Sequence, residues 1–526
     1  MAVGRSGTGE LTVNTGGTVA VNTAIAVGEG EVIGPNSEAG FGVVNIGAAG
    51  TVTIAGTGLA AGAAALTAGN YAGATGIIKV SGKAAVLNAG THDIRLGTNT
   101  GNPASSGDGL LSVSNGGLVF AGTIVVGDTG TGDFTANIGG ALATALDDGA
   151  QAGSQGNILL TGPTTGLGLN ALTVGDKGLG HVAVTGGANL VVHGTVTVGN
   201  AVGATGYIAL ATGGHLFAQG LIDGGNGTGA LTVDSASVLS ITNGLTVGPT
   251  GALSLQGGNI NAGQIVNNAH IAGAGAISTL GMTNNGVATA AGGLLAIAGP
   301  VTGTGVLAIA PNGALEVRGT GAGQVFGFAA PGGVLQLDNF VATGAGAITN
   351  FAPGDQIRIA TAGNVSTSFN AATDALSITA AGSTHSFQMT GAHSAADFTS
   401  AVVGVDTVLA ANQAINLGTG PHFLYLGAAS TNDTITAPTP SVGATPNFVD
   451  IFNFAATDKL DFTAALGSTN WNGNAATVGN YLSVATSGNN AVISLSATSG
   501  GAGVAIVTLE NSGPKTLAQV LAQATI

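Results

Sequence analysis

The chain has 526 residues, of which 95 are glycine, 44% are hydrophobic and only 6% are charged. Disordered chains are rich in charge and poor in apolar residues, so this composition excludes disorder and favours many short strands joined at glycine corners. The formal charge of −15, with no basic run, excludes a nucleic-acid partner, and the absence of cysteine excludes disulfides and thiolate metal sites.

A tetrapeptide of the form apolar-x-Val-Gly recurs through the first half of the chain. Its closing glycines are Gly28, Gly127, Gly175, Gly199 and Gly248, and the gaps of 99, 48, 24 and 49 residues are close to multiples of about 24. A fixed period of this length is typical of stacked repeat architectures. The sequence therefore predicts a coil built from units of one length.

Each unit has the alternation of short strands. The unit that begins at Gly229 carries three apolar pairs at alternate positions, namely Leu231 and Val233, Leu239 and Ile241, and Leu245 and Val247. Such short strands cannot bury a face alone, so each unit must pair with the unit before it and the unit after it. This predicts a parallel β-helix, with glycines of positive φ at its corners.

The same order of strands is expected from residue 11 to 28 and from 110 to 127. Residues 56–109 and 128–170 keep the period poorly and are expected to form rungs with longer loops. Residues 1–300 would then form roughly 12 rungs that rise about 60 Å at ordinary strand spacing.

Residues 9 to about 300 resemble the glycine-rich β-strand repeats of bacterial autotransporter passengers and related large surface proteins. The resemblance implies an exported, surface-associated β-helix. It implies no particular ligand.

Near residue 300 the period is lost and phenylalanine becomes common. Residues 348–357 match residues 451–460, an offset of 103. We therefore predict two smaller β-rich modules, one at 301–411 and one at 412–526.

The last module resembles the C-terminal secretion-target domain of proteins exported by bacterial type I systems. The resemblance is carried by five segments, 449–454, 458–462, 491–495, 504–510 and 516–521. It implies that this module directs the unfolded chain through a type I secretion apparatus without an N-terminal signal. Residues 1–10 lack the profile of a cleaved signal peptide, and no stretch predicts a transmembrane span.

Two groups of residues were considered for catalysis. Asp147 and Asp148 form an acidic doublet, whose side chains should diverge on a strand and which we expect in an exposed loop. His92, Asp93 and Arg95 form the densest polar cluster, expected on a solvent-facing strand with no visible partner. No catalytic residue is predicted from either group.

Metal and cofactor sites are not predicted either, although calcium binding stays open as an alternative. His181, His193 and His215 occupy different positions in their units, so they should not align as a metal ladder. The calcium motif Gly-Gly-x-Gly-x-Asp is broken in both candidate segments, 224–229 and 432–435. Glycine-rich phosphate loops lack the following helix that dinucleotide binding needs.

Two further features have structural explanations. Trp471 and the phenylalanines at 448, 452, 454 and 462 are expected in the core of the last module rather than on a sugar-stacking platform. Thr195 and Thr197 are expected at ordinary exposed strand positions rather than in a flat binding array.

Together these features predict an all-β, secreted, cell-surface protein that is not an enzyme. It would act as a structural or adhesive component, such as an adhesin, matrix or surface-layer scaffold. Its partners would be cell-surface or matrix components, itself or a polysaccharide. The alternative is an extracellular polysaccharide-active enzyme, which three or more converging Asp, Glu, Arg or Lys side chains in a cleft would favour.

Overall fold

The computed structural model describes residues 1–33, 36–60, 63–98, 107–321, 323–340, 346–352, 354–360, 365–390, 393, 398–403, 406–411, 414–416, 421–425, 434–439, 448–452, 454–456, 458–510 and 512–526. The chain divides into two compact units. Unit 1 comprises Met1–Thr289 and Leu295–Gly305, and unit 2 comprises Ala290–Leu294 and Val306–Ile526. Strand β28 (Val287–Ile297) has residues in both.

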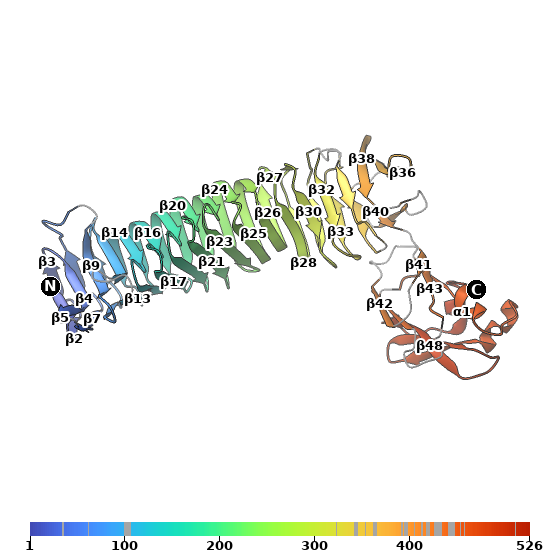
Figure 1. Ribbon diagram of the computed structural model, residues 1–526, viewed down its shortest axis with the longest axis horizontal. Helices are drawn as coiled ribbons and strands as arrows, with labels where there is room; N and C mark the ends of the chain where they lie inside the picture. Colours follow the sequence, from blue (N-terminus) through green and yellow to red (C-terminus); the bar gives the residue numbers. More distant parts are fainter. Residues whose placement is uncertain are drawn as a thin grey trace. The chain divides into compact units, whose positions relative to one another are not determined.

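Unit 1 is a coil in which successive turns pair in parallel (Figure 1). Three ladders of strands run along it, which we call faces a, b and c. Face a consists of β2 (Thr8–Val13), β7 (Phe41–Ile46), β10 (Thr75–Ser81), β13 (Asp108–Ser114), β15 (Thr131–Asn137), β17 (Gln155–Thr161), β19 (Leu179–Thr185), β21 (Thr205–Ala211), β23 (Thr228–Asp234) and the first parts of β25 (Gly251–Asn267) and β26 (His270–Thr279).

Face b consists of β3 (Thr18–Val21), β8 (Thr51–Ile54), β11 (Val86–Asn88), the first parts of β14 (Leu118–Val126), β16 (Gly140–Asp148), β18 (Gly166–Val174), β20 (Asn189–Val198), β22 (His215–Asp223) and β24 (Val238–Val247), and later parts of β25 and β26. Face c consists of β1 (Ala2–Arg5), β4 (Ile25–Glu29), β9 (Ala64–Asn70), β12 (Asp93–Thr98), the last parts of β14, β16, β18, β20, β22, β24 and β25, and the strands β27 (Met282–Asn284) and β29 (Val301–Thr302). Strands β5 (Glu31–Ile33) and β6 (Asn36–Glu38) form a separate antiparallel pair.

The fold-class prediction is confirmed, because the apolar members of each unit form the interior of a parallel β-helix. Alternate residues point inward on every face, and Val174, Val184 and Leu190 are fully buried. Burying one such side chain contributes about 1.5–3 kcal/mol, and the stacking repeats this gain at every turn. The irregular residues 56–109 also form rungs, since β10 pairs with β7 on one side and β13 on the other.

The corner between faces c and a depends on glycine. Gly175 closes a face-c strand with φ of +69°, as the apolar-x-Val-Gly motif predicted. A second glycine row lies on face a, where Gly180 pairs with Gly206. A Cβ at Gly206 would lie 2.2 Å from the carbonyl oxygen of Val174. The two rows therefore let successive strands approach at this corner more closely than any side chain allows.

Unit 2 begins with short parallel strands of the same kind. One ladder contains β30 (Val306–Ile309), β32 (Val325–Phe328) and β34 (Ala347–Thr349), and the other contains β31 (Ala314–Val317), β33 (Val334–Leu337) and β35 (Gln356–Ile359). Val306 pairs with Val325, and Val325 with Ala347, so the repeat is 19 and then 22 residues. Coil-type pairing thus extends into the predicted module 301–411, where the 24-residue period is no longer visible.

A meander and a hairpin of antiparallel strands pair with the last strands of the two ladders, β34 and β35. The three strands β36 (Ser366–Asn370), β37 (Ala375–Ala380) and β38 (Ser383–Thr390) form a meander, and β38 pairs with β34. Strands β39 (Phe398–Val403) and β40 (Asp406–Ala411) form a hairpin, and β40 pairs with β35. The open edges of both ladders are therefore hydrogen-bonded.

The remaining strands form two sheets. One contains β41 (Ala414–Asn416), β43 (Thr434–Thr436), β45 (Lys459–Asp461) and β49 (Ala524–Thr525). The other contains β42 (Pro421–Tyr425), β44 (Phe448–Phe452), β48 (Gly503–Glu510), β47 (Asn490–Ser496) and β46 (Leu482–Ser487). Two short helices, α1 (Thr463–Gly467) and α2 (Leu517–Leu521), and a 3-10 helix (Ala475–Asn480) accompany them.

The match between residues 348–357 and 451–460 corresponds to one type of turn. Asp355 accepts a hydrogen bond from the backbone N–H of Ala352 at 2.9 Å, and Asp458 accepts one from Ala455 at 2.7 Å. In each case the turn joins strands of two different ladders, β34 to β35 and β44 to β45. Of the matched residues, Pro353, Asn453 and Thr457 lie outside the described part of the chain.

Candidate functional site

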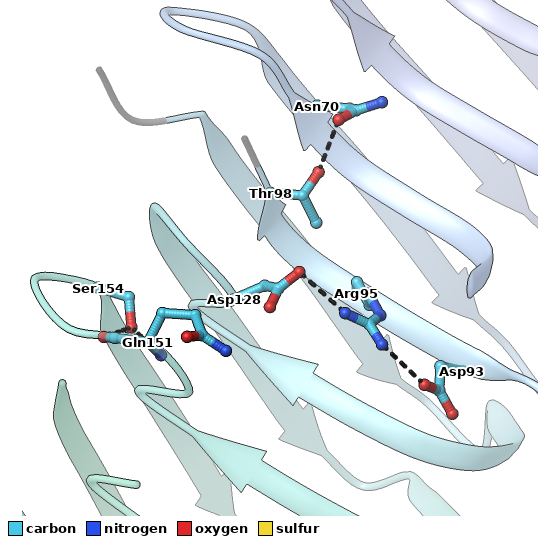
Figure 2. A network of polar contacts seen from close by, with 7 residues as sticks. All are labelled: Asn70, Asp93, Arg95, Thr98, Asp128, Gln151 and Ser154. Carbon is cyan, nitrogen blue, oxygen red and sulfur yellow. Dashed lines mark hydrogen bonds and ion pairs between the residues drawn. The ribbon is translucent and has the colours of Figure 1, made fainter. Parts of the chain in front are cut away.

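The densest charged cluster in unit 1 is centred on Arg95, on the outer surface of face c (Figure 2). Its guanidinium donates to Asp93 in the same strand and to Asp128 in the next turn of the coil, each at 3.2 Å. Asp128 lies in the corner that follows Gly127, so the coil brings it opposite Arg95 although the two are 33 residues apart in sequence. The cluster of Asp93 and Arg95 therefore has a partner that sequence reasoning missed, and His92 takes no part in these ion pairs.

Asp147 extends the cluster along the same face. The register pairs Arg95 with Val125 and Val125 with Asp147, so Asp147 points outward two turns from Arg95. Burial, followed by the negative charge of Asp176, raises the pKa of Asp147 to about 6, while Lys177 and Arg95 oppose the increase. A carboxyl with this pKa can hold or release a proton near neutral pH, which is the requirement for general acid or base chemistry.

The neighbouring Asp148 behaves differently. The expectation of an exposed loop for Asp147 and Asp148 is wrong, because both lie in strand β16 and Asp148 is fully buried. Their side chains point to opposite sides of the strand, so they do not form a catalytic pair. Burial raises the pKa of Asp148 well above its ordinary value.

The three histidines of neighbouring turns lie on different ladders. His181 belongs to face a, where it pairs with Asn157 and Tyr207, whereas His215 begins a face-b segment and stacks on Phe217. His193 lies in β20 where the register shifts between faces b and c. Among the described residues, no group of three or more His, Asp or Glu is placed to hold a metal ion.

The two broken calcium motifs have separate outcomes. Gly224 forms a corner with φ of +68°, and Gly229 pairs with Gly206 in the glycine row of face a. This segment therefore belongs to the packing of the coil. Asn432 and Asp433 lie outside the described residues.

The threonine and aromatic candidates have the following surroundings. Thr195 pairs with Gly220, and Thr197 pairs with Thr173 and Ile222, so the outward row is mixed rather than a flat threonine array.

In the last module Phe462 is buried, and Phe454 and Trp471 pack against the same core. The side chains of Phe448 and Phe452 are not part of what the structure describes.

Face b carries a shallow hollow of about 380 Å³. Gly140 and Gly166 form its floor, and Leu118, Leu142 and Val191 are among the side chains around it. The hollow arises because Gly140 and Gly166 are paired neighbours on one outward row, which leaves two successive strands without side chains there. Its lining is apolar except for His193, and it contains none of the carboxyl groups of face c.

No protein-family model and no curated protein matches this sequence. Within the described residues, no helix is both long and apolar enough to cross a membrane.

Proposed function

We propose that this protein is a secreted bacterial cell-surface scaffold or adhesin, and that its coil serves as a stiff spacer. The observation that carries the proposal is the continuous parallel pairing of unit 1, in which the same three ladders continue turn after turn. Each turn is held by backbone hydrogen bonds and buried aliphatic rows on both sides, so bending the coil requires many contacts to break together. Matrix or cell-surface components would be its partners.

Export by a type I apparatus is part of this proposal and rests on the resemblance of residues 412–526 to a secretion-target domain. The test is to delete residues 440–526 in producing cells and to measure the protein in the medium and on intact cells with an antibody against unit 1. We expect the deleted chain to remain inside the cell. Undiminished export would overturn the assignment.

A matched control removes a similar length from the coil. Deleting residues 131–227 takes out four whole turns, because Thr131, Gln155, Leu179, Thr205 and Thr228 are successive partners in one row. Gly130 then joins Thr228 in register. This variant should still be exported and should label intact cells, so that loss of export reports on the C-terminal residues rather than on chain length.

A polysaccharide-active enzyme is the second candidate, and the cluster of Asp93, Arg95, Asp128 and Asp147 favours it. Polysaccharide hydrolysis requires two carboxyl groups on either side of the bond that breaks, one of them protonated. The test is release of new reducing ends from a panel of acidic and neutral polysaccharides. Asp147→Asn should abolish any activity, whereas Asp234→Asn, at a half-buried position on face a, should not.

A further inference from the structure

Face b of unit 1 is free of formal charge. Eleven strand segments contribute to it, and none of their residues, all within the described part, is Asp, Glu, Lys or Arg. His215 is the single ionisable side chain in these segments. At about 4.8 Å per strand, the uncharged surface is roughly 50 Å long.

The other two faces carry the charge of unit 1. Residues 1–305 contain thirteen Asp and Glu against five Lys and Arg, a formal charge of −8. Lys79, Asp108 and Asp133 lie in face-a strands, and Arg95 and Asp147 lie on face c. Two copies of the coil that meet through face b keep the net negative charge of their other faces farthest apart, so electrostatic repulsion favours this face over the other two.

Face b also has exposed apolar side chains beside a matching hollow. Leu142 is 58% exposed, and Leu118 and Phe217 are 41% and 40% exposed. The hollow over Gly140 and Gly166 adjoins Leu142 on the same surface. A surface that holds both a protruding apolar side chain and an apolar hollow can pair with itself across a two-fold axis. The side chain of each copy then faces the hollow of the other copy.

We propose that face b is the surface through which a second copy of this chain binds, coil against coil. The projected area is on the order of 600 Å² for strands of four residues at ordinary spacing, near the ~800 Å² per partner of a standard interface. Leu142 of each copy would lie against the hollow of its partner. The inference deepens the proposed scaffold function, because lateral pairing would join single coils into thicker fibres or patches. Only this biological use rests on the proposed function.

The test is sedimentation velocity of the full chain between about 1 μM and about 100 μM. We expect reversible association, weakened at least about tenfold by Leu142→Glu, which places a charge on each side of the interface. Leu159→Glu is the matched control, because Leu159 is an outward leucine on face a with 42% exposure. It should leave association unchanged. Added salt should strengthen association, since it screens the negative charge of the remaining faces.

A second measurement does not depend on a charged substitution. The chain has no cysteine, so Leu142→Cys and Leu159→Cys each introduce a single thiol. A short bismaleimide should cross-link Leu142→Cys into dimers and leave Leu159→Cys monomeric. Circular dichroism spectra that match the unsubstituted chain show that each variant is folded.

Three results would overturn the inference: a monomer at every concentration, an equal effect of Leu159→Glu, or cross-linking through Leu159→Cys alone. Binding of a glycan or a lipid vesicle to a chain that stays monomeric would also overturn it. These outcomes are separate from the export test. A monomer on the cell surface would leave the proposed scaffold function standing, and a dimer that stays inside the cell would contradict the scaffold function alone.

Discussion

The carboxyl group of Asp223 accepts a hydrogen bond from the backbone N–H of Ala252, one turn further along the coil, at 3.0 Å. Asp223 is fully buried at the position where the neighbouring turns have Val198 and Val247. Its other oxygen has no hydrogen-bond partner among the described residues. An acid therefore stands in an aliphatic row with only part of its hydrogen-bonding capacity satisfied, and burial raises its pKa to about 7.

This position predicts that the coil is more stable in mild acid than at neutral pH. Because the pKa of Asp223 is 3.8 ordinarily and about 7 in the folded chain, the folded state holds a proton that the unfolded state releases between these values. The free energy of unfolding should therefore fall as the pH rises through this window, by roughly 2–4 kcal/mol. Guanidinium denaturation at about pH 5 and about pH 8, followed by circular dichroism, measures the difference.

Asp223→Asn is the control for this pH dependence. Asparagine keeps the shape and cannot titrate, so the curve of unfolding free energy against pH should flatten. Some dependence should remain, because burial also raises the pKa values of Asp148 and, to about 6, of Asp355. An unchanged slope in Asp223→Asn would contradict the assignment.

Replacing Asp148 by valine should stabilise the protein. Asp148 pairs with Val126 and Val174 in the same row, and the backbone N–H of His181 faces its carboxyl without closing a hydrogen bond of ordinary geometry. Asp148→Val removes a buried polar group that lacks compensation, so we expect about 1–3 kcal/mol of added stability at neutral pH. The reverse change, Val174→Asp, should destabilise the same row. Denaturant midpoints of the two variants should thus move in opposite directions.

The recurring strand pattern was sufficient to predict the coil, although the turns differ in length. Thr8 pairs with Phe41 at an interval of 33 residues, whereas Thr131 pairs with Gln155 at an interval of 24. Leu231, Leu239 and Leu245 each begin an apolar pair, and each lies inside a different face. The glycine row of face a could also have been found, since Gly180, Gly206 and Gly229 precede the strand residues of consecutive units. The packing role of these glycines does not follow from the sequence, because it depends on which backbone atoms of the preceding turn lie beside each of them.

The charged cluster and the buried acids could not be predicted in the same way. The pairing of Arg95 with Asp128 depends on which strands of face c lie in successive turns, and residues 56–109 keep the period poorly. Acids are seldom buried without a partner, so the sequence gives no reason to place Asp148 in the core. The uncharged face is a property of one ladder, and its members are separated in sequence by charged residues of the other two faces.

Adding a methyl group to the glycine row of face a should be costly, whereas adding one at a glycine outside this row should be harmless. A Cβ at Gly206 would lie 2.2 Å from the carbonyl oxygen of Val174, and the backbone on both sides is held by paired strands. Gly206→Ala should lower the free energy of unfolding by about 2–4 kcal/mol. Gly244→Ala is the matched control, since a Cβ there meets no atom within 4 Å, and its effect should stay within about 0.5 kcal/mol. Thermal melts of both variants decide the matter, and equal melting temperatures would refute the packing role of the row.

Arg95 should couple two turns of the coil. Its guanidinium, 33% exposed, is held between Asp93 and Asp128, and removing it leaves two partly buried carboxylates without a cation. Arg95→Gln should therefore lower stability by about 1–2 kcal/mol and raise the pKa of Asp147 further, because Arg95 opposes that increase.

A double-mutant cycle with Asp128→Asn separates the ion pair from other effects of the Arg95 substitution. We expect the two changes together to cost less than their sum by about 1 kcal/mol, because the second removes the carboxylate that the first left unpaired. Lys177→Gln is the comparison, since its pair with Asp176 is 3.7 Å long and more exposed, and its effect should stay below about 0.5 kcal/mol. Two results would contradict this coupling. The effects of Arg95→Gln and Asp128→Asn on the free energy of unfolding would be strictly additive, and the pKa of Asp147, followed by NMR, would be the same with and without Arg95. In that case the cluster would neither stabilise the coil nor shift the pKa of Asp147 for acid–base chemistry.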